Sequence, residues 1–304
     1  MRRIKPDIVV VCSSNMAPYI LDLPETQDAI RLIDLIDVDS EKWRSYADVE
    51  SFPMRQVYRR EWRRVAALEA RIVRECDWST FVSEAEANIF RKEQIRYSDR
   101  IRAISNGVDL VYFDPALAFE PLYPLDKPNF VFTGTMDYPP NVDAVVWFAE
   151  EILPLIRQTM PAAQFHVVGT SPAPKVEALT SIPGVFVTGR VPDVRAYVAH
   201  ADASVAPMRI ARGIQNKVLE AMAMGRPTIV TSDALEGIHA VPGTELLLAN
   251  TAEEFAHACL AAAGLAGESL GTAARQRVEK DYAWPALLGQ FDRLLNEGKA
   301  APVL

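Results

Sequence analysis

The stretch from residue 207 to residue 231 constrains the fold of this chain more than any other. It reads PMRIARGIQNKVLEAMAMGRPTIVT, a polar loop, a helix, a tight turn and a strand in direct succession. Strong helix formers without a breaker fill residues 216–224, and Gly225 and Pro227 then end the helix. The apolar run at 228–231 is typical of a buried parallel strand.

Charged side chains gather around the start of this helix. Arg209, Arg212 and Lys217 surround the first turn, where unpaired N–H groups and the helix dipole favour an anion such as phosphate. Glu220 follows Lys217 by three residues and shares its helix face, where a carboxylate can accept hydrogen bonds from sugar hydroxyls. Phosphate and sugar together predict a nucleotide-sugar site. The alternative is an ordinary core helix with solvated charges.

Apolar runs and helical segments alternate along the rest of the chain, which predicts parallel βαβ units, doubly wound sheets and ligand binding beyond the carboxyl ends of the strands. We expect strands at 8–12, 32–36, 80–82, 101–104, 130–133, 165–168, 185–187, 203–206, 228–230 and 246–248, and longer helices at 54–76, 141–160, 216–224 and 252–265. The run at 8–12 is apolar throughout, so we expect a strand buried on both faces. The segment 114–128, with four prolines, is the predicted linker.

Composition limits the classes of function. The 304 residues suffice for two domains, and the net charge of −8 argues against nucleic-acid binding. Cys12, Cys76 and Cys259 are far apart and odd in number, which argues against disulfides or a zinc cluster and fits a reducing cytoplasm. No Gly-x-Gly-x-x-Gly, Walker loop or nucleophile elbow is present, which argues against dehydrogenases, P-loop NTPases and hydrolases of that type.

Two further patterns leave alternatives open. The helix expected at 54–76 is rich in arginine, so its polar side is either simply solvated or makes peripheral contact with anionic membrane lipid. The arginines are Arg55, Arg59, Arg60, Arg63, Arg64, Arg71 and Arg74. Asp37 and Asp39 have the spacing of a metal-binding pair, but we favour a polar strand end, or a place near the acceptor, and expect no metal.

The segment with Lys217, Glu220, Gly225 and Pro227 in fixed register resembles the donor-site motif of GT-B glycosyltransferases of family 4. Residues 104–109, 129–148, 165–169 and 187–193 resemble other segments of that family, and 36–43 with 81–86 resemble its exopolysaccharide and PEP-CTERM-associated sugar transferases. The resemblance implies an α/β fold of the GT-B type with two doubly wound Rossmann-like domains, the N-terminal one incomplete. It places a partial acceptor-side domain at 1–120, a nucleotide-sugar-binding domain at 121–282, and a C-terminal helix at 283–304 that packs back toward the first domain.

The resemblance also implies an activity. It is that of a retaining glycosyltransferase that moves a sugar from a UDP-sugar or GDP-sugar to a saccharide or polyprenyl-linked acceptor in cell-surface polysaccharide synthesis, without a further cofactor. Such an enzyme would work in the cytoplasm or at the inner face of the membrane. Lys217, Glu220 and Arg212 are its expected catalytic residues. The residues expected to bind the donor are Gly134, Arg190, Val191, Arg209, Gly213, Ile214, Lys217 and Glu220.

The chain departs from the family pattern at two positions of the expected site. Relatives usually carry two glutamates separated by seven residues, and here Glu220 is the second while Arg212 occupies the first position. Many relatives also have a basic residue just after the glycine that corresponds to Gly134, where this chain has Thr135. Two alternatives therefore stand beside the transferase: a non-catalytic nucleotide-sugar-binding or scaffold protein and, less favoured, a nucleotide-sugar epimerase, which shares the GT-B shape.

Overall fold

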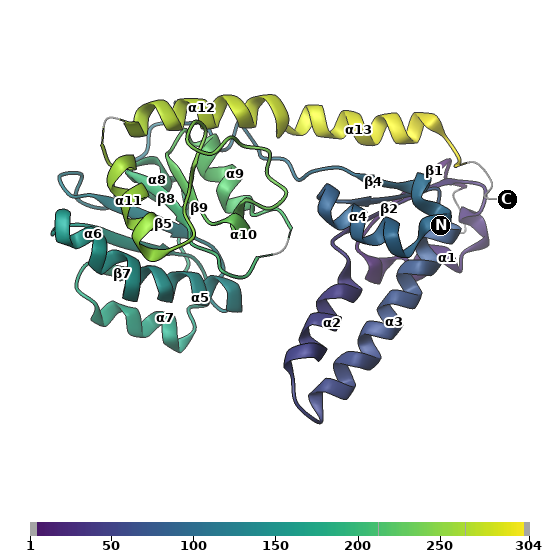
Figure 1. Cartoon of the computed structure of the whole chain (residues 1–304). Coiled ribbons are helices and arrows are strands. Elements are labelled where there is room, and N and C mark those ends of the chain that lie inside the picture. The colour runs from purple at the N-terminus through teal and green to yellow at the C-terminus, as the bar shows by residue number, and fades with distance from the viewer. Residues whose placement is uncertain (1–4, 212, 265, 301–304) are drawn as a thin grey trace. The chain divides into compact units, whose positions relative to one another are not determined.

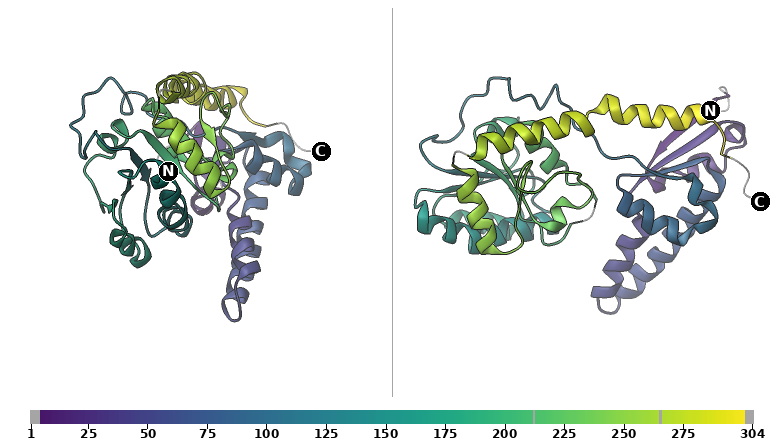
Figure 2. Two further views of the ribbon diagram at one scale, coloured as in Figure 1. Left: turned by 60° about the vertical axis from the view of Figure 1, so that its left-hand side comes forward. Right: turned by 45° about the horizontal axis from the view of Figure 1, so that its top comes forward.

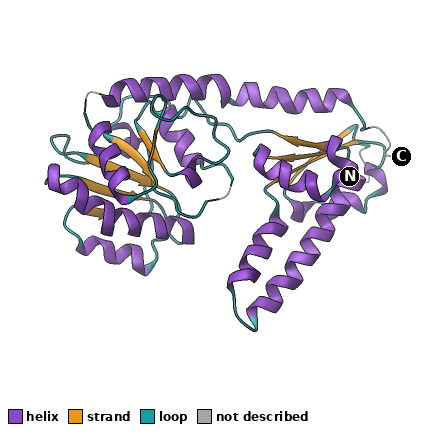
Figure 3. Cartoon of the chain, in the orientation of Figure 1, coloured by secondary structure: helices purple, strands orange, loops and turns teal. Residues whose placement is uncertain are grey.

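The computed structural model of the chain describes residues 5–211, 213–264 and 266–300, with the side chain of residue 266 left out. It divides into two compact units, the first made of Met1–Ser105 and Pro285–Leu304 and the second of Asn106–Trp284. Each unit is built on a parallel sheet accompanied by helices, which gives an α/β fold as expected (Figure 3).

The first unit has a four-stranded parallel sheet in which neighbours along the chain are neighbours in space. Its strands are β1 (Ile8–Cys12), β2 (Ile30–Ile36), β3 (Trp78–Phe81) and β4 (Ile101–Ala103), in the order β1-β2-β3-β4. Its helices are α1 (Pro18–Leu21), α2 (Asp39–Val49), α3 (Met54–Glu75), α4 (Glu84–Glu93) and α13 (Trp284–Glu297), with short 3-10 turns at Ser14–Met16, Pro24–Thr26 and Ile95–Arg100.

The expectation that strand β1 is buried on both faces is wrong. Within the described residues β1 is an edge strand, and Ile8 and Val10 are 44% and 56% exposed, whereas Val9 between them is buried. An apolar run is therefore compatible with a strand that buries only one face, because apolar residues alone do not say how many layers cover a sheet.

Helices α2 and α3 form a hairpin that projects beyond the sheet of their own unit (Figures 1 and 2). Two carboxylates hold its base. Glu86 accepts a hydrogen bond from the backbone N–H of Val38 at 2.7 Å, and Glu69 accepts one from that of Ser40 at 3.1 Å. Both acceptors lie at the N-terminus of α2, where a negative charge is favoured by the helix dipole.

The second unit has a six-stranded parallel sheet of the doubly wound type. Its strands are β5 (Asn129–Thr133), β6 (Gln164–Val168), β7 (Val185–Val187), β8 (Ala203–Ala206), β9 (Thr228–Val230) and β10 (Leu247–Leu248). Their order in space is β10-β9-β8-β5-β6-β7, so the order reverses between β5 and β8. In such sheets a crevice forms beyond the carboxyl ends of the two strands at the reversal.

Helices flank the strands of the second unit on both sides (Figure 3). They are α5 (Pro139–Trp147), α6 (Leu153–Thr159), α7 (Pro174–Ala178), α8 (Arg195–Ala199), α9 (Asn216–Ala223), α10 (Ser232–Leu235), α11 (Ala252–Ala262) and α12 (Ala266–Asp281), with a 3-10 turn at Leu179–Ser181. The helix expected at 141–160 corresponds to α5 and α6, which a wide π-type turn at Phe148–Ile152 joins. The helix expected at 252–265 ends at Ala262, and residue 265 lies outside the described residues.

The proline-rich segment at 114–128, expected to be a linker, belongs to the second unit. The Tyr123 ring stacks on His166 of β6 with 4.3 Å between ring centroids, and its hydroxyl donates to the carbonyl oxygen of Tyr197. Asn129 at the start of β5 donates from Nδ2 to the carbonyl oxygen of Pro124 at 2.9 Å. The prolines hold this segment in an extended conformation while it packs on the second unit. Composition alone does not distinguish such a packed segment from a linker between domains.

Candidate functional site

The reversal point of the second sheet brings two helix starts together. β5 ends at Thr133, and Gly134 then leads into the turn before α5. β8 ends at Ala206, and the loop after it leads to α9 at Asn216. Because the two parallel strands are neighbours, their carboxyl ends share one edge of the sheet, and so do the loops and helices that follow them.

Lys217 of α9 joins the two helices. Its Nζ donates a hydrogen bond to Oδ1 of Asn141 on α5 at 2.6 Å and lies 4.3 Å from the centroid of the Phe132 ring. Asn141 is only 5% exposed, and its Nδ2 donates to the carbonyl oxygen of Thr135 at 2.9 Å, which fixes the orientation of the amide. Burial lowers the pKa of Lys217 to about 8, and nearby Glu220 opposes that shift.

Gly134 and Gly169 allow the backbone to approach this lysine closely. A Cβ added to Gly134 would lie 2.8 Å from Nδ2 of Asn141 and 3.5 Å from Nζ of Lys217. A Cβ added to Gly169, which follows β6, would lie 1.6 Å from the carbonyl oxygen of Gly134. The Gly134 N–H also donates to the carbonyl oxygen of Val168 at 3.0 Å. Only glycine therefore fits at both positions with the turn in this place.

Glu220 lies one helical turn after Lys217 on α9 and is half-buried. Burial raises the pKa of its carboxyl group, and the charge of Lys217 opposes that change. Among the residues that the structure describes, none donates a hydrogen bond to this carboxylate. A half-buried carboxylate of this kind can accept hydrogen bonds from the hydroxyl groups of a ligand.

The loop before α9 provides the backbone of the expected anion site. Gly213 has φ +65°, a left-handed conformation that glycine adopts without strain, and Ile214 is buried beside it. Gln215 at the N-cap makes no side-chain hydrogen bond that caps the helix, so the first N–H groups of α9 are not satisfied by its side chain. Asn106 donates from Nδ2 to Oδ1 of Asn216 at 3.2 Å, which brings the turn at 105–109 to this helix start. Arg212 lies outside the described residues.

The remaining expected residues lie less directly at this cluster. Arg209 makes a bidentate ion pair with Asp143 on α5, with N–O distances of 2.6 and 3.0 Å, and its guanidinium lies over the ring of Trp147. Its charge is therefore already compensated. Arg190 and Val191 follow the end of β7, a strand that β6 separates from β5, and Arg190 is exposed there.

Asn141 is the site residue that sequence reasoning missed. In the sequence it appears only as part of the helix expected at 141–160, because a polar residue in the first turn of a helix is usually exposed. One signal was available. Asn141 follows the Gly134 turn by seven residues and is the only amide side chain in α5, whose other residues are mostly apolar. Gly169 directly follows the strand expected at 165–168, but its contact with Gly134 depends on the register of β5 and β6.

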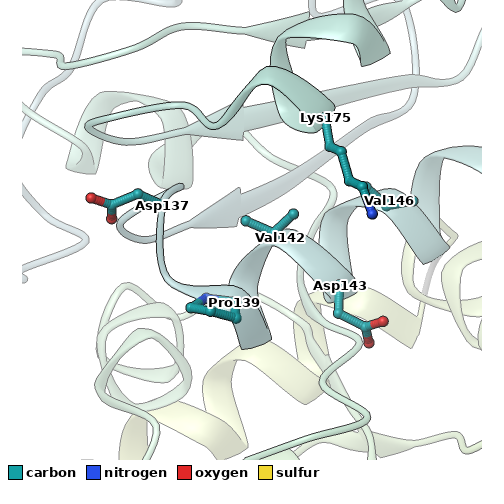
Figure 4. A pocket seen from close by; sticks show the side chains of 6 residues that line it. All are labelled: Asp137, Pro139, Val142, Asp143, Val146 and Lys175. Carbon is teal, nitrogen blue, oxygen red and sulfur yellow. The ribbon is translucent and has the colours of Figure 1, made fainter. Parts of the chain in front are cut away.

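A surface pocket lies beside the start of α5, as Figure 4 shows. Its lining comes from the turn before α5, from α5 itself and from α7, and consists of Asp137, Pro139, Val142, Asp143, Val146 and Lys175. Asp143 is the partner of Arg209, so this pocket borders the loop after β8. In the described part of the chain, no group of three or more His, Cys, Asp or Glu side chains is placed to hold a metal ion. No described helix is both long and apolar enough to cross a bilayer.

Residues 127–263 match the family described as Glycosyl transferases group 1. A comparison of the sequence with curated proteins gave no match. The region 127–263 contains Gly134, Asn141, Gly169, Lys217 and Glu220.

Many solved structures share the fold at low sequence identity. Sucrose-phosphate synthase from Thermosynechococcus elongatus superposes with a TM-score of 0.70 at 18% identity, over 96% of this chain and 73% of that one. TarM from S. aureus, in complex with fondaparinux, alpha-GlcNAc-glycerol and UDP, gives 0.69 at 15% identity over 94% of this chain and 55% of that one. Anabaena HepE in complex with UDP-glucose gives 0.68 at 12% identity over 95% and 78%.

These likenesses agree with the arrangement of the strands. The structural neighbours are GT-B glycosyltransferases, and the two parallel α/β units are consistent with their pair of Rossmann-like domains. At such low identity the superpositions establish the fold alone. The family match covers the region in which Lys217, Asn141 and Glu220 lie. The chain thus has a GT-B fold, and its residues 127–263 match the model of the family described as Glycosyl transferases group 1.

Proposed function

We propose that this chain is a retaining glycosyltransferase that moves a sugar from a UDP-sugar or GDP-sugar to a saccharide or lipid-linked acceptor in cell-surface polysaccharide synthesis, at the cytoplasmic side of the membrane. The observation that carries the proposal is the partly buried Lys217–Asn141 pair at the reversal point of the second sheet, inside the region that matches the group 1 family, with Glu220 one turn away. The UDP and UDP-glucose complexes of TarM and HepE support this class of donor.

In this proposal Lys217 and the start of α9 bind the diphosphate. When the bond between the sugar C1 and the phosphate oxygen breaks, negative charge develops on the leaving diphosphate. The ammonium group of Lys217 and the N–H groups of Gly213 and Ile214 stabilise that charge from fixed positions, so they favour the transition state over the ground state. Asn141 holds the ammonium group in place, and partial burial strengthens its field.

Glu220 orients the donor in the same proposal. Its carboxylate accepts hydrogen bonds from the ribose hydroxyls and so fixes the direction of the reacting carbon. Arg190 and Val191 lie near the base. Arg209 and Arg212 add positive charge close to the diphosphate or the transferred sugar, and Arg209 must first loosen its pair with Asp143.

The proposed transfer retains the configuration at C1. The acceptor oxygen attacks C1 from the side on which the diphosphate leaves, the new C–O bond forms as the C–O bond to phosphate breaks, and the acceptor proton passes to the leaving phosphate oxygen. The atoms balance without a protein side chain acting as the base. The role of the chain is to hold both substrates and to compensate the charge of the diphosphate.

The proposal can be tested in two stages on the full chain. Thermal unfolding is measured with UDP, GDP and ADP, and then release of the free nucleoside diphosphate is measured from each matching nucleotide sugar with and without a saccharide acceptor. We expect one diphosphate to raise Tm, because only the folded chain binds it. K217M and E220Q should each reduce the shift in Tm and slow release at least tenfold, whereas the exposed-site controls K280M and E253Q should change neither.

Three outcomes would decide against the proposal. If no diphosphate raises Tm and E220Q behaves like wild type, the interpretation of the site is wrong. Binding without acceptor-dependent release would favour the non-catalytic nucleotide-sugar-binding or scaffold protein, to which the arginine at position 212 is relevant. Interconversion of free nucleotide sugars would favour the epimerase.

A further inference from the structure

The end of the α2–α3 hairpin exposes apolar side chains to an unusual degree. Val49 and Phe52 at the turn are 83% and 82% exposed, and Met54 and Val57 on the first turns of α3 are 41% and 46% exposed. These four residues, the hairpin tip, come from one short segment of the chain. Clusters of exposed apolar residues at a projecting end are uncommon in soluble proteins and mark sites of contact with another apolar phase.

Five arginines of α3 lie beside the tip or directly behind it. Arg55, Arg59, Arg60, Arg63 and Arg64 are all exposed, and among the described residues none of them is within ion-pair distance of a carboxylate. The arginines nearer the base differ: Arg71 pairs with Asp22 and Glu75, and Arg74 pairs with Glu75. The acidic residues close to the tip are Asp48, Glu50 and Glu61. These three acidic residues offset only part of the charge of the five arginines, so the region keeps a positive charge at its surface in a chain whose net charge is −8.

The hairpin is built as a rigid element. Trp43 and Tyr46 on α2 and Tyr58 on α3 form a cluster with ring centroids 5.7 to 6.1 Å apart. The buried carboxylates of Glu86 and Glu69 hold the base through Val38 and Ser40. The residues of the tip can therefore enter another apolar phase while the hairpin keeps its fold.

We propose that the tip of the α2–α3 hairpin inserts into the surface of an anionic bilayer, with the arginines of α3 on the lipid headgroups. Apolar side chains at the end and arginines one to three turns behind match the layered chemistry of a membrane interface, in which acyl chains lie beneath a negatively charged surface. Long arginine side chains also reach headgroups while their stems stay near apolar groups. A partner protein or a second copy would have to present both an apolar patch and a dense negative surface.

This inference goes beyond the proposed function and does not depend on it, because binding to vesicles requires neither donor nor acceptor. The test uses the full chain with sucrose-loaded vesicles of phosphatidylcholine, or of phosphatidylcholine with 30 mol% phosphatidylglycerol (a composition chosen as about that of an anionic membrane). We expect sedimentation with the anionic vesicles only. Raising the salt to about 0.5 M should weaken it, since added ions screen the arginines.

Two variants separate the apolar and the charged parts of the site. V49S/F52S removes the apolar tip, and R59Q/R63Q removes two of the arginines. Each arginine near an anionic surface contributes a factor of about five in affinity, so R59Q/R63Q should weaken binding roughly tenfold or more. The matched control is L288S/R293Q on α13, which changes one exposed apolar and one exposed basic residue elsewhere and should bind like wild type.

The result that would overturn the inference is sedimentation that ignores acidic lipid, or wild-type binding by both hairpin variants. Self-association measured by light scattering without lipid, lost in V49S/F52S, would show that a second copy covers the tip instead. The shift in Tm with nucleoside diphosphates is measured on the same variants and should be unchanged, so failure of this inference is distinct from failure of the proposed function.

Discussion

At the scale of the residue, Lys217 combines burial with a place where an anion is expected. Burial disfavours its charged form and lowers its pKa to about 8, yet its Nζ keeps one strong partner, the amide oxygen of Asn141. A neutral partner orients the ammonium group without cancelling its charge. A carboxylate in the place of Asn141 would compensate that charge and leave less for a phosphate.

We therefore predict that affinity for the nucleoside diphosphate falls as pH rises through 8. Only the protonated lysine attracts the diphosphate, and at pH 9 most of the free protein has lost that proton, so Kd should increase about fivefold or more between pH 7.5 and pH 9. Isothermal titration at several pH values measures this change. In K217M the binding is weak and the dependence on pH disappears. A flat profile in the wild type would contradict the prediction.

Variants of Asn141 test whether this residue orients the ammonium group of Lys217 or only packs against it. N141D places an opposite charge beside the ammonium group, so the pKa of Lys217 should rise by about one unit or more and the fall in affinity should move to higher pH. The same carboxylate should weaken binding at pH 7.5. N141L should lose affinity without this upward movement. If all three proteins share one pH profile, Asn141 only packs against the lysine.

At the scale of the element, the site depends on how closely two strand ends approach. The carbonyl oxygen of Gly134 occupies the place where Gly169 would carry a Cβ, at 1.6 Å. The turn after β5 thus rests against the end of β6, and Asn141 is carried on the helix that follows. Two conditions allow this close approach. Position 169 must be a glycine, and the register of β5 and β6 must place Gly134 opposite it.

We predict that G169A damages stability and binding together. The added methyl group must displace the turn at Gly134, which should lower the free energy of unfolding by about 1–3 kcal/mol and reduce nucleotide affinity. Denaturant unfolding and titration calorimetry measure the two effects. G289A in α13 is the matched control, because its Cβ meets no atom within 4 Å, and there alanine should stabilise the helix by about 0.5–1 kcal/mol. Unchanged binding by G169A would contradict the prediction.

Much of the element order can be predicted because strands in parallel sheets are continuous apolar runs. β7, β8 and β9 begin and end at the predicted residues, and β1 does so too. The exposure of β1 could not be predicted, since it depends on which strands and layers lie beside it. The π-type turn between α5 and α6 was also missed, because its residues, Phe148–Ile152, include no glycine or proline that would mark an interruption of the helix.

At the scale of the whole molecule, each unit carries its own feature: the Lys217–Asn141 pair belongs to the second and the hairpin tip to the first. The cluster around Lys217 could be predicted in part, because charges at a helix start have a local sequence pattern. Its link to Asn141 could not, because that contact depends on β5 and β8 being neighbours. The exposure of the hairpin tip could not be predicted either, since an apolar residue near a turn usually packs against the core.

We predict that donor and lipid protect different parts of the chain from amide hydrogen exchange. The nucleoside diphosphate should slow exchange around 133–141 and 207–220, and anionic vesicles should slow it around 46–64. Mass spectrometry of peptides from the full chain measures both patterns. Protection of the hairpin by the diphosphate alone, or of residues 207–220 by vesicles alone, would contradict this separation. Neutral vesicles serve as the control for the lipid arm.

The lysine–amide bridge spans 76 positions along the chain. During synthesis, the whole segment from Asn141 to the end of α9 must leave the ribosome before the bridge can close. Closing so long a loop costs conformational entropy that a contact within one helix does not. Under the proposed function, a chain in which the bridge has not closed lacks the complete diphosphate site. The donor would then bind only chains that have completed this step and would stabilise the folded state by mass action.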